Sequence, residues 1–137
     1  MLSKAMRALI LEEQARQNGC FIPNVDLDAY LAKLEAKAEF VSDTMAARCR
    51  GFVAFYCNDM DTRKAYITLV LVDPLDRGLG IGQALVAYVL STAKRRGFIG
   101  CQLEVSKGNQ AAYEMYLSQG FHLLEDRGGR CLLEIDL

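Results

Sequence analysis

The sequence carries no excess of charge of one sign and no long hydrophobic run. Its 137 residues include 16 lysines and arginines against 17 aspartates and glutamates, for a formal net charge of −1. This balance argues against a protein that binds nucleic acid through bulk positive charge. No apolar run approaches the roughly 20 residues of a membrane-spanning helix, and the one at residues 8–11 is too short, and too soon acidic, for a signal peptide. We therefore expect no contact with nucleic acid or with a membrane.

Paired cysteines and histidines are also lacking. The cysteines are odd in number and scattered, and none forms a C-x-x-C pair, so the sequence indicates neither a zinc site nor a disulfide framework. His122 is the only histidine, and no Cys–His or Ser–His pairing signals a covalent nucleophile. We expect a cytoplasmic protein with reduced thiols and no metal. The five cysteines are Cys20, Cys49, Cys57, Cys101 and Cys131.

The sequence does have the composition of one globular domain over residues 1–137. Hydrophobic residues make up 52% and charged residues 24%, which is typical of a folded domain. Caps, breakers and periodicity predict an α/β domain with a mixed sheet, in which two N-terminal helices precede a β-α-β-α-β second half. Helices are expected over residues 3–17, about 27–36, about 80–95 and 110–119, and strands over 38–43, 49–57, 64–72, 100–105, 121–125 and 131–135.

The most informative stretch is the glycine-rich turn at residues 72–82. An apolar strand pattern leads into this turn, and an amphipathic helix pattern leaves it. Its glycines let the backbone pass close to an anion, and the start of the helix supplies partial positive charge. Proteins often bind phosphate with such bare N–H groups. A tight turn without a ligand is the alternative, but three glycines beside Arg77 favour a phosphate site.

The spacing of these glycines excludes the two common phosphate motifs. A P-loop requires Lys and then Ser or Thr after its last glycine, and neither follows here. A dinucleotide fingerprint, G-x-G-x-x-G, would place its third glycine at Gln83 or Leu85. What remains is the pattern R-x-x-G-x-G, formed by Arg77, Gly80 and Gly82.

This pattern, after a strand ending in V-x-P, resembles the acetyl-CoA-binding motif of the GNAT superfamily of N-acetyltransferases. A second pattern agrees independently, because L-E-V at residues 103–105 precedes a match to the family's N-x-x-A-x-x-L-Y-x-x-x-G-F. The two motifs cover roughly residues 51–121, and the resemblance implies a GNAT-like acyl-CoA N-acyltransferase fold. The second match is made by Asn109, Ala112, Met115, Tyr116, Gly120 and Phe121.

The resemblance also implies how acetyl-CoA is held. The main chain at the end of strand 64–72 is expected to bind the pantetheine arm, and the N–H groups of the turn are expected to bind the pyrophosphate, with Arg77 as a supporting cation. In the family this strand and strand 100–105 splay apart, and the acyl group lies between them. The expected residues are Val70, Leu71 and Val72 for the arm, and Gly78, Leu79, Gly80, Ile81, Gly82 and Gln83 for the pyrophosphate.

Three residues around the second motif are implied to act on the cofactor or the acceptor. Asn109 matches a position that hydrogen-bonds the cofactor arm, although a helix N-cap is the ordinary use of asparagine. Tyr116 matches the tyrosine that protonates the departing thiolate, although its apolar neighbours also suit a core residue. Glu104 lies where one branch, similar to the bacterial ribosomal-protein N-terminal acetyltransferases, carries its proton acceptor. The alternatives for Glu104 are to face solvent or to pair with a basic residue.

This residue set suits acetyl transfer to a primary amine that attacks directly in a ternary complex. The acceptor site is expected within residues 18–44, whose aromatic and mildly acidic side chains could receive an amino sugar, a polyamine or a peptide N-terminus. We expect a small-molecule amine; a protein N-terminal or lysine acetyltransferase and a non-catalytic acyl-CoA-binding module stay open, as does a homodimer. The candidate acceptor residues are Phe21, Asn24, Asp26, Asp28 and Tyr30.

One feature departs from the family, which usually begins with a strand before its first helix. Here only Met1 and Leu2 precede the helix pattern. Three explanations stay open: the strand is absent, a partner chain supplies it, or the helix begins later than the pattern suggests.

Overall fold

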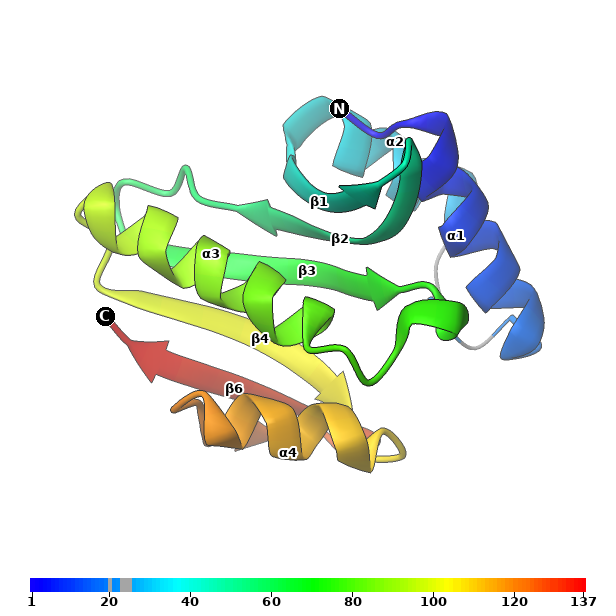
Figure 1. Cartoon of the computed structure of the whole chain (residues 1–137). Helices are drawn as coiled ribbons and strands as arrows, with labels where there is room; N and C mark the ends of the chain where they lie inside the picture. The colour runs from blue at the N-terminus through cyan, green and yellow to red at the C-terminus, as the bar shows by residue number, and fades with distance from the viewer. Residues whose placement is uncertain (20, 23–25) are drawn as a thin grey trace.

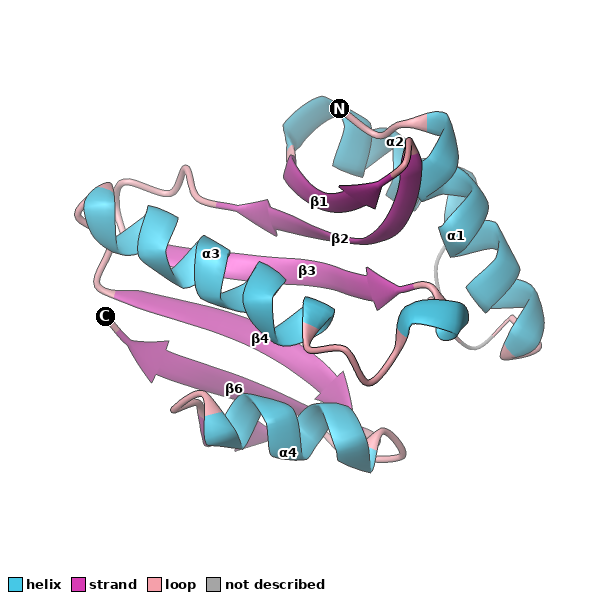
Figure 2. Cartoon of the chain, viewed as in Figure 1, coloured by secondary structure: helices cyan, strands magenta, loops and turns pink. Residues whose placement is uncertain are grey.

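The computed structural model describes residues 1–19, 21–22 and 26–137 and arranges them as helices on both faces of a twisted mixed sheet (Figures 1 and 2). Each helix and strand expected from the sequence is present, with its ends shifted by at most two residues. A short 3-10 turn, η1 (Pro74–Asp76), precedes the third helix. The elements are α1 (Lys4–Arg16), α2 (Leu27–Lys37), β1 (Glu39–Met45), β2 (Arg48–Tyr56), β3 (Lys64–Val72), α3 (Ile81–Arg95), β4 (Gly100–Ser106), α4 (Gln110–Ser118), β5 (His122–Asp126) and β6 (Arg130–Asp136).

Both N-terminal helices begin at side-chain caps and pack on one face of the sheet. The Ser3 hydroxyl accepts a hydrogen bond from the Met6 amide, and the Asp26 carboxylate accepts from the amides of Asp28 and Ala29. These bonds satisfy amides that a helix start leaves unpaired. The core on this face combines Leu9 and Ile10 of α1, Leu31 and Leu34 of α2, and Phe52, Ala54, Leu69 and Leu71 of the sheet.

The sheet has the strand order β1-β2-β3-β4-β6-β5, and β3 and β4 form its parallel pair. α3 and α4 cover the face opposite α1 and α2, so each face of the sheet has its own core. Since α1 begins at Lys4 and residues 1–3 form no strand, the explanation that the helix begins later is wrong. β1 is therefore one edge strand of the sheet in the described part of the chain, and β5 is the other.

The central feature of the sheet is a fork between β3 and β4. Their pairing runs only from Lys64 opposite Gly100 to Ile67 opposite Leu103, although both strands continue beyond it. On the other side of β3, Ile67 and Leu69 pair with consecutive residues of β2, so Thr68 is the extra residue of a β-bulge. Beyond this bulge, the β4-facing backbone groups of β3 have no strand partner among the described residues.

The described cysteines are buried and free, and Cys20 lies outside the described residues. Burial raises the pKa of the Cys101 thiol to about 12, so this thiol stays protonated at neutral pH. His122 is exposed at the start of β5. Within the described residues, no helix is long and apolar enough to cross a membrane, and no group of three or more His, Cys, Asp or Glu side chains could hold a metal ion.

Candidate active site

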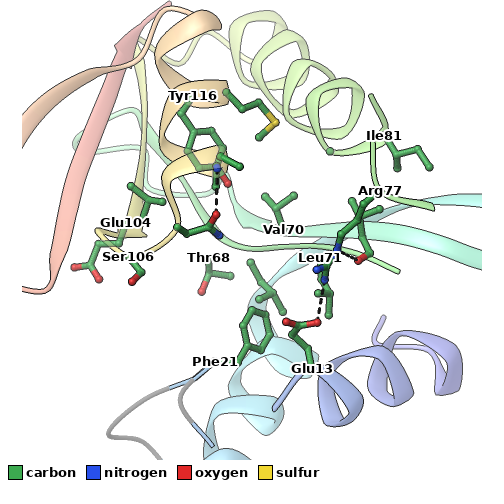
Figure 3. Close-up of a pocket in the computed structure, with 18 of the residues that line it drawn as sticks. Glu13, Phe21, Thr68, Val70, Leu71, Arg77, Ile81, Glu104, Ser106 and Tyr116 are labelled. Atoms are coloured by element: carbon green, nitrogen blue, oxygen red, sulfur yellow. Dashed lines mark hydrogen bonds and ion pairs between the residues drawn. The ribbon is translucent and has the colours of Figure 1, made fainter. Parts of the chain in front are cut away.

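A cleft of about 1150 Å³ opens where β3 and β4 diverge (Figure 3). Its walls come from α1 and the loop after it, α2, the ends of both strands, the glycine turn and the start of α4. The side chain of Leu79 is 65% exposed and does not line the cleft, so only its backbone can serve the site. The other residues predicted to bind the cofactor or act on it all line the cleft: Val70, Leu71, Val72, Arg77, Gly78, Gly80, Ile81, Gly82, Gln83, Glu104, Asn109 and Tyr116.

The glycine turn has the geometry of an anion cradle. Gly78 and Gly80 adopt φ values of 83° and 79°, which side-chain-bearing residues rarely adopt. Gly80 is the N-cap of α3 and no side chain caps this helix. Accordingly, the amides of residues 78–83 donate hydrogen bonds to no other described residue. A row of unpaired amides at the start of a 15-residue helix suits a phosphate group.

Gly82 forms the floor of a narrow apolar slot between the turn and the fork. A Cβ atom added at Gly82 would lie 3.6 Å from Cγ2 of Val72 and 3.9 Å from both Sδ of Met115 and Cγ1 of Val70. A larger side chain would therefore project into the slot. A slender extended chain such as the pantetheine arm suits this space, along the part of β3 that has no β4 partner.

Arg77, predicted as a supporting cation for the pyrophosphate, is bound to α1. Its Nη2 donates to Oε1 of Glu13 at 2.9 Å, and its Nε donates to the Val72 carbonyl at 3.1 Å (Figure 3). The buried Glu13 carboxylate also accepts hydrogen bonds from Arg16 and Gln17. Burial opposes ionisation of Glu13, but the bonds from Gln17, Arg16 and Arg77 outweigh it and lower its pKa. Arg77 thus connects the glycine turn to α1. Its Nη1 has no hydrogen-bond partner among the described residues and could bind a ligand.

Sequence reasoning missed Glu13 because its partner lies 64 residues away and its helix shows no special pattern. The neighbouring Gln14 is also structural: its side chain donates to the carbonyls of Gly19 and Ile22 and accepts from the Ile22 amide. The same turn of α1 therefore holds both the glycine turn and the loop that borders the cleft.

Tyr116 points from α4 toward the fork (Figure 3). It is 7% exposed, and its ring packs edge-on against Phe121 with the ring centroids 5.8 Å apart. Burial raises the pKa of its hydroxyl to about 12, so it stays protonated at neutral pH. The hydroxyl makes no hydrogen bond with the described residues. The side chain is thus a core residue that also lines the cleft.

Asn109 caps a helix, which is the ordinary use of asparagine. It is the N-cap of α4, and its side-chain oxygen accepts a hydrogen bond from the Ala112 amide at 3.2 Å. The capping bond holds the side chain at the edge of the cleft and leaves its amide nitrogen available for a ligand.

Glu104 is held by two arginines, which was one of the alternatives for this residue. Arg127 donates from Nη1 at 2.6 Å and Arg130 donates from Nε at 3.0 Å. Burial opposes ionisation, but these hydrogen bonds and charges outweigh it and lower the pKa of Glu104. The carboxylate is therefore ionised at neutral pH and lies at the end of the fork, near Ser106 (Figure 3).

Only some of the residues predicted to receive the acceptor line the cleft. Phe21 and Tyr30 line it, and the Tyr30 hydroxyl lies 3.1 Å from Oγ1 of Thr68. Asp26 and Asp28 are exposed and lie outside the lining, because Asp26 caps α2. Asn24 lies outside the described residues. The lining residues that sequence reasoning missed on this side include Tyr66, Thr68, Ser106 and Arg130.

The chain matches the model of the acetyltransferase (GNAT) family over residues 24–121. This match spans more than half of the chain and includes both sequence motifs, so the chain belongs to the GNAT acetyltransferase family. The resemblance noted from the sequence is thereby confirmed.

Individual relatives agree with this family. An uncharacterized N-acetyltransferase from Methanocaldococcus jannaschii is 41% identical over 75 residues, which are 52% of this chain and 33% of that protein. The chain thus spans about a third of the length of this curated relative. Two crystal structures are also similar in fold. The ribosomal-protein-S18-alanine N-acetyltransferase from Escherichia coli has a TM-score of 0.76 at 17% identity, covering 98% of this chain and 90% of that chain. The PaiA N-acetyltransferase from Thermoplasma acidophilum, in complex with coenzyme A, has a TM-score of 0.70 at 17% identity, covering 98% and 80%.

Proposed function

We propose that this protein transfers an acetyl group from acetyl-CoA to a primary amine. The observation that carries the proposal is the fork between β3 and β4. The unpaired amides of the glycine turn and the side chain of Tyr116 line the same cleft as this fork. Family membership supports the same donor. The acceptor we propose is a small-molecule amine such as an amino sugar or a polyamine, with a peptide N-terminus as the alternative.

Acetyl-CoA would be held mainly by backbone groups. The amides of residues 78–83 suit the pyrophosphate. The edge of β3 at residues 70–72, which has no β4 partner, suits the amide groups of the pantetheine arm, and the Asn109 side chain offers a further hydrogen bond. Arg77 adds positive charge near the phosphates. Acetyl-CoA supplies the activated acyl group, a thioester whose carbonyl an amine can attack.

The protein's part in the chemistry is to move two protons. Tyr116 donates its phenolic proton to the sulfur as the carbon–sulfur bond breaks. Glu104, through a water molecule, accepts one proton from the ammonium form of the acceptor, and the neutral amine then attacks the carbonyl carbon; the second proton that the nitrogen loses as the amide forms returns through water to the Tyr116 phenolate. Backbone amides of β3 at the fork stabilise the charge on the carbonyl oxygen. The raised pKa of Tyr116 and the lowered pKa of Glu104 keep each group in the form that this scheme requires at neutral pH.

A screen for acetyl-CoA turnover tests this proposal. Thiol release would be measured with amino sugars, polyamines, amino acids and peptides as acceptors, and acetyl-CoA binding would be measured separately by calorimetry. Turnover on any small amine supports the proposal. Tight binding without turnover on any acceptor would instead identify a non-catalytic acyl-CoA-binding module, and preferred turnover on peptides would move the acceptor to the protein class.

A further inference from the structure

The acceptor end of the cleft contains a charge pair rather than a single charge. Glu104 on β4 and Arg130 at the start of β6 both line it, joined through Oε1 and Nε at 3.0 Å. The other cleft-lining carboxylates lie on α1 and η1, where Glu13 binds Arg77 and Asp76 binds Arg48 in a bidentate pair. The charges that an acceptor meets at this end are therefore those of Glu104 and Arg130.

Arg130 has donors to spare. Only its Nε is hydrogen-bonded, so neither terminal nitrogen of its guanidinium has a partner among the described residues. Its neighbour Arg127 differs, because it uses Nη1 for Glu104 and Nη2 for Glu125 and does not line the cleft. The Arg130 side chain is 38% exposed, which leaves the outer edge of the guanidinium accessible. A planar guanidinium edge of this kind matches a carboxylate with two parallel hydrogen bonds.

We propose that the acceptor amine carries a carboxylate of its own, and that Arg130 binds this carboxylate. This inference rests on the proposed acetyl transfer to a small-molecule amine and, within that class, favours compounds of the amino-acid type over amino sugars and polyamines. The ammonium group of such a compound faces Glu104, and its carboxylate faces the free edge of Arg130, so the two charge pairs are complementary. A polyamine would satisfy Glu104 but would meet Arg130 with charge of the same sign.

The surroundings of the pair suit a compact zwitterion. Tyr30 and Tyr66 present phenols from α2 and β3, and Thr68 adds a hydroxyl at the bulge. Burial raises the pKa of both tyrosines, so their hydroxyls are uncharged donors at neutral pH. Phe21 gives this side an apolar surface against which an aliphatic or aromatic side chain of the acceptor can pack (Figure 3).

The test compares each amino acid with its own amide, which lacks the carboxylate charge. Because amidation also lowers the pKa of the α-amino group, kcat/KM is expressed for both compounds per unprotonated amine. We expect the wild-type protein to acetylate at least one of the twenty common amino acids with a kcat/KM about tenfold or more above that of its amide, because a charged bidentate contact is worth at least a tenfold change. In the Arg130→Gln variant, KM for the acid should rise about tenfold while KM for the amide stays level, which removes the preference. Calorimetry of amino-acid binding to the CoA complex should show the same loss without relying on turnover.

Two variants make the result specific. Lys107→Gln removes one positive charge near the cleft, from a side chain that pairs with the exposed Asp126 and does not line the cleft, and it should leave the preference intact. Arg130→Lys should restore only part of it, because lysine lacks the guanidinium fork. Equal use of acid and amide by the wild type, or an equal effect of Arg130→Gln on both, would overturn the inference while leaving acetyl transfer standing. Absence of turnover on every amine would overturn the proposed function, and with it the inference.

Discussion

The donor end and the acceptor end of the cleft are built in different ways. The donor end is made largely of backbone from one continuous stretch, residues 70–83, whose amides and glycine conformations form the cradle. The acceptor end is made of side chains from α2, β3, β4, β6 and the loop after α1, brought together only by the fold. Backbone amides are the same whatever residue carries them, whereas side chains define a ligand individually. The donor end is thus suited to one constant ligand, and the acceptor end to one that varies among relatives.

The largest effect should follow from Gly80→Glu, which attacks the donor end where backbone conformation matters. A side chain is strained at a φ of 79°, and a carboxylate there repels a pyrophosphate. We expect acetyl-CoA affinity to fall about 100-fold or more, equivalent to about 2.7 kcal/mol, as measured by calorimetry. Gly97→Glu is the matched control, since Gly97 has a φ of 81° just after the C-terminal end of α3 and does not line the cleft. If Gly80→Glu binds acetyl-CoA as tightly as this control does, the phosphate assignment is wrong.

Tyr116→Phe should separate chemistry from binding. Loss of the phenolic proton should lower kcat by about 10- to 100-fold, because a general acid contributes about that much or more, whereas acetyl-CoA affinity should stay unchanged. Tyr113→Phe, on the same helix but outside the cleft lining, is the control and should keep full kcat. A Tyr116→Phe variant with the wild-type kcat would remove this hydroxyl from the mechanism.

The sequence predicted the donor end far better than the acceptor end. Gly80, Gly82, Asn109 and Tyr116 belong to short motifs whose spacing is visible along the chain, and the cleft contains all four. Arg130 could not be predicted in the same way, because it reaches Glu104 only through the pairing of β4 with β6. The order of strands in a sheet is a tertiary property, and no local periodicity encodes it.

The fold likewise has features that the sequence predicts locally and features that it does not. Helices and strands followed from caps, glycines and hydrophobic period, since these act within a few residues. The bulge at Thr68 and the fork that follows it depend on how β3 fits between two strands at once, so neither has a local signature. Asp26 and Asp28 show the converse, because acidic residues at the start of a helix cap it or suit its first turn and need not belong to a binding site.

Glu104→Gln should have a smaller effect, because a carboxylate that acts through water contributes less than a direct acid. We expect kcat/KM to fall about tenfold near neutral pH. The pKa of Glu104 lies below its ordinary value, so the wild-type enzyme should lose activity only as the pH falls into the acidic range, and the variant should lack this acidic limb. A pH–rate profile of kcat/KM with one acceptor provides the measurement. If the variant keeps the wild-type profile, Glu104 is not the proton acceptor.

The smallest effect should come from Glu13→Gln, which weakens the contact of α1 with Arg77 and so the connection between the acceptor and donor ends of the cleft. The folded-state pKa of Glu13 is lowered, so its ionised form stabilises the fold above the ordinary glutamate pKa, and this stabilisation is lost as the pH falls through the folded value. We expect the variant to lose about 1 to 2 kcal/mol of unfolding free energy at pH 7 and clearly less at pH 3, as measured by urea denaturation. Because α1 holds the cleft loop and Arg77 holds the turn, acetyl-CoA affinity and acceptor KM should both worsen by only about two- to fivefold.

The matched control for this connection is Glu12→Gln, since Glu12 is exposed on the same helix turn. It should leave stability and both ligand affinities at wild-type values. Combining Glu13→Gln with Arg77→Gln in a double-mutant cycle isolates the contact itself, because two residues that act through one ion pair give less than additive losses. If the losses of unfolding free energy and of ligand affinity in the two single variants simply add up in the double variant, the Glu13–Arg77 ion pair does not connect the two ends of the cleft. A coupling of about 0.5 kcal/mol or more would mean that the helix bordering the acceptor helps to hold the turn that binds the donor.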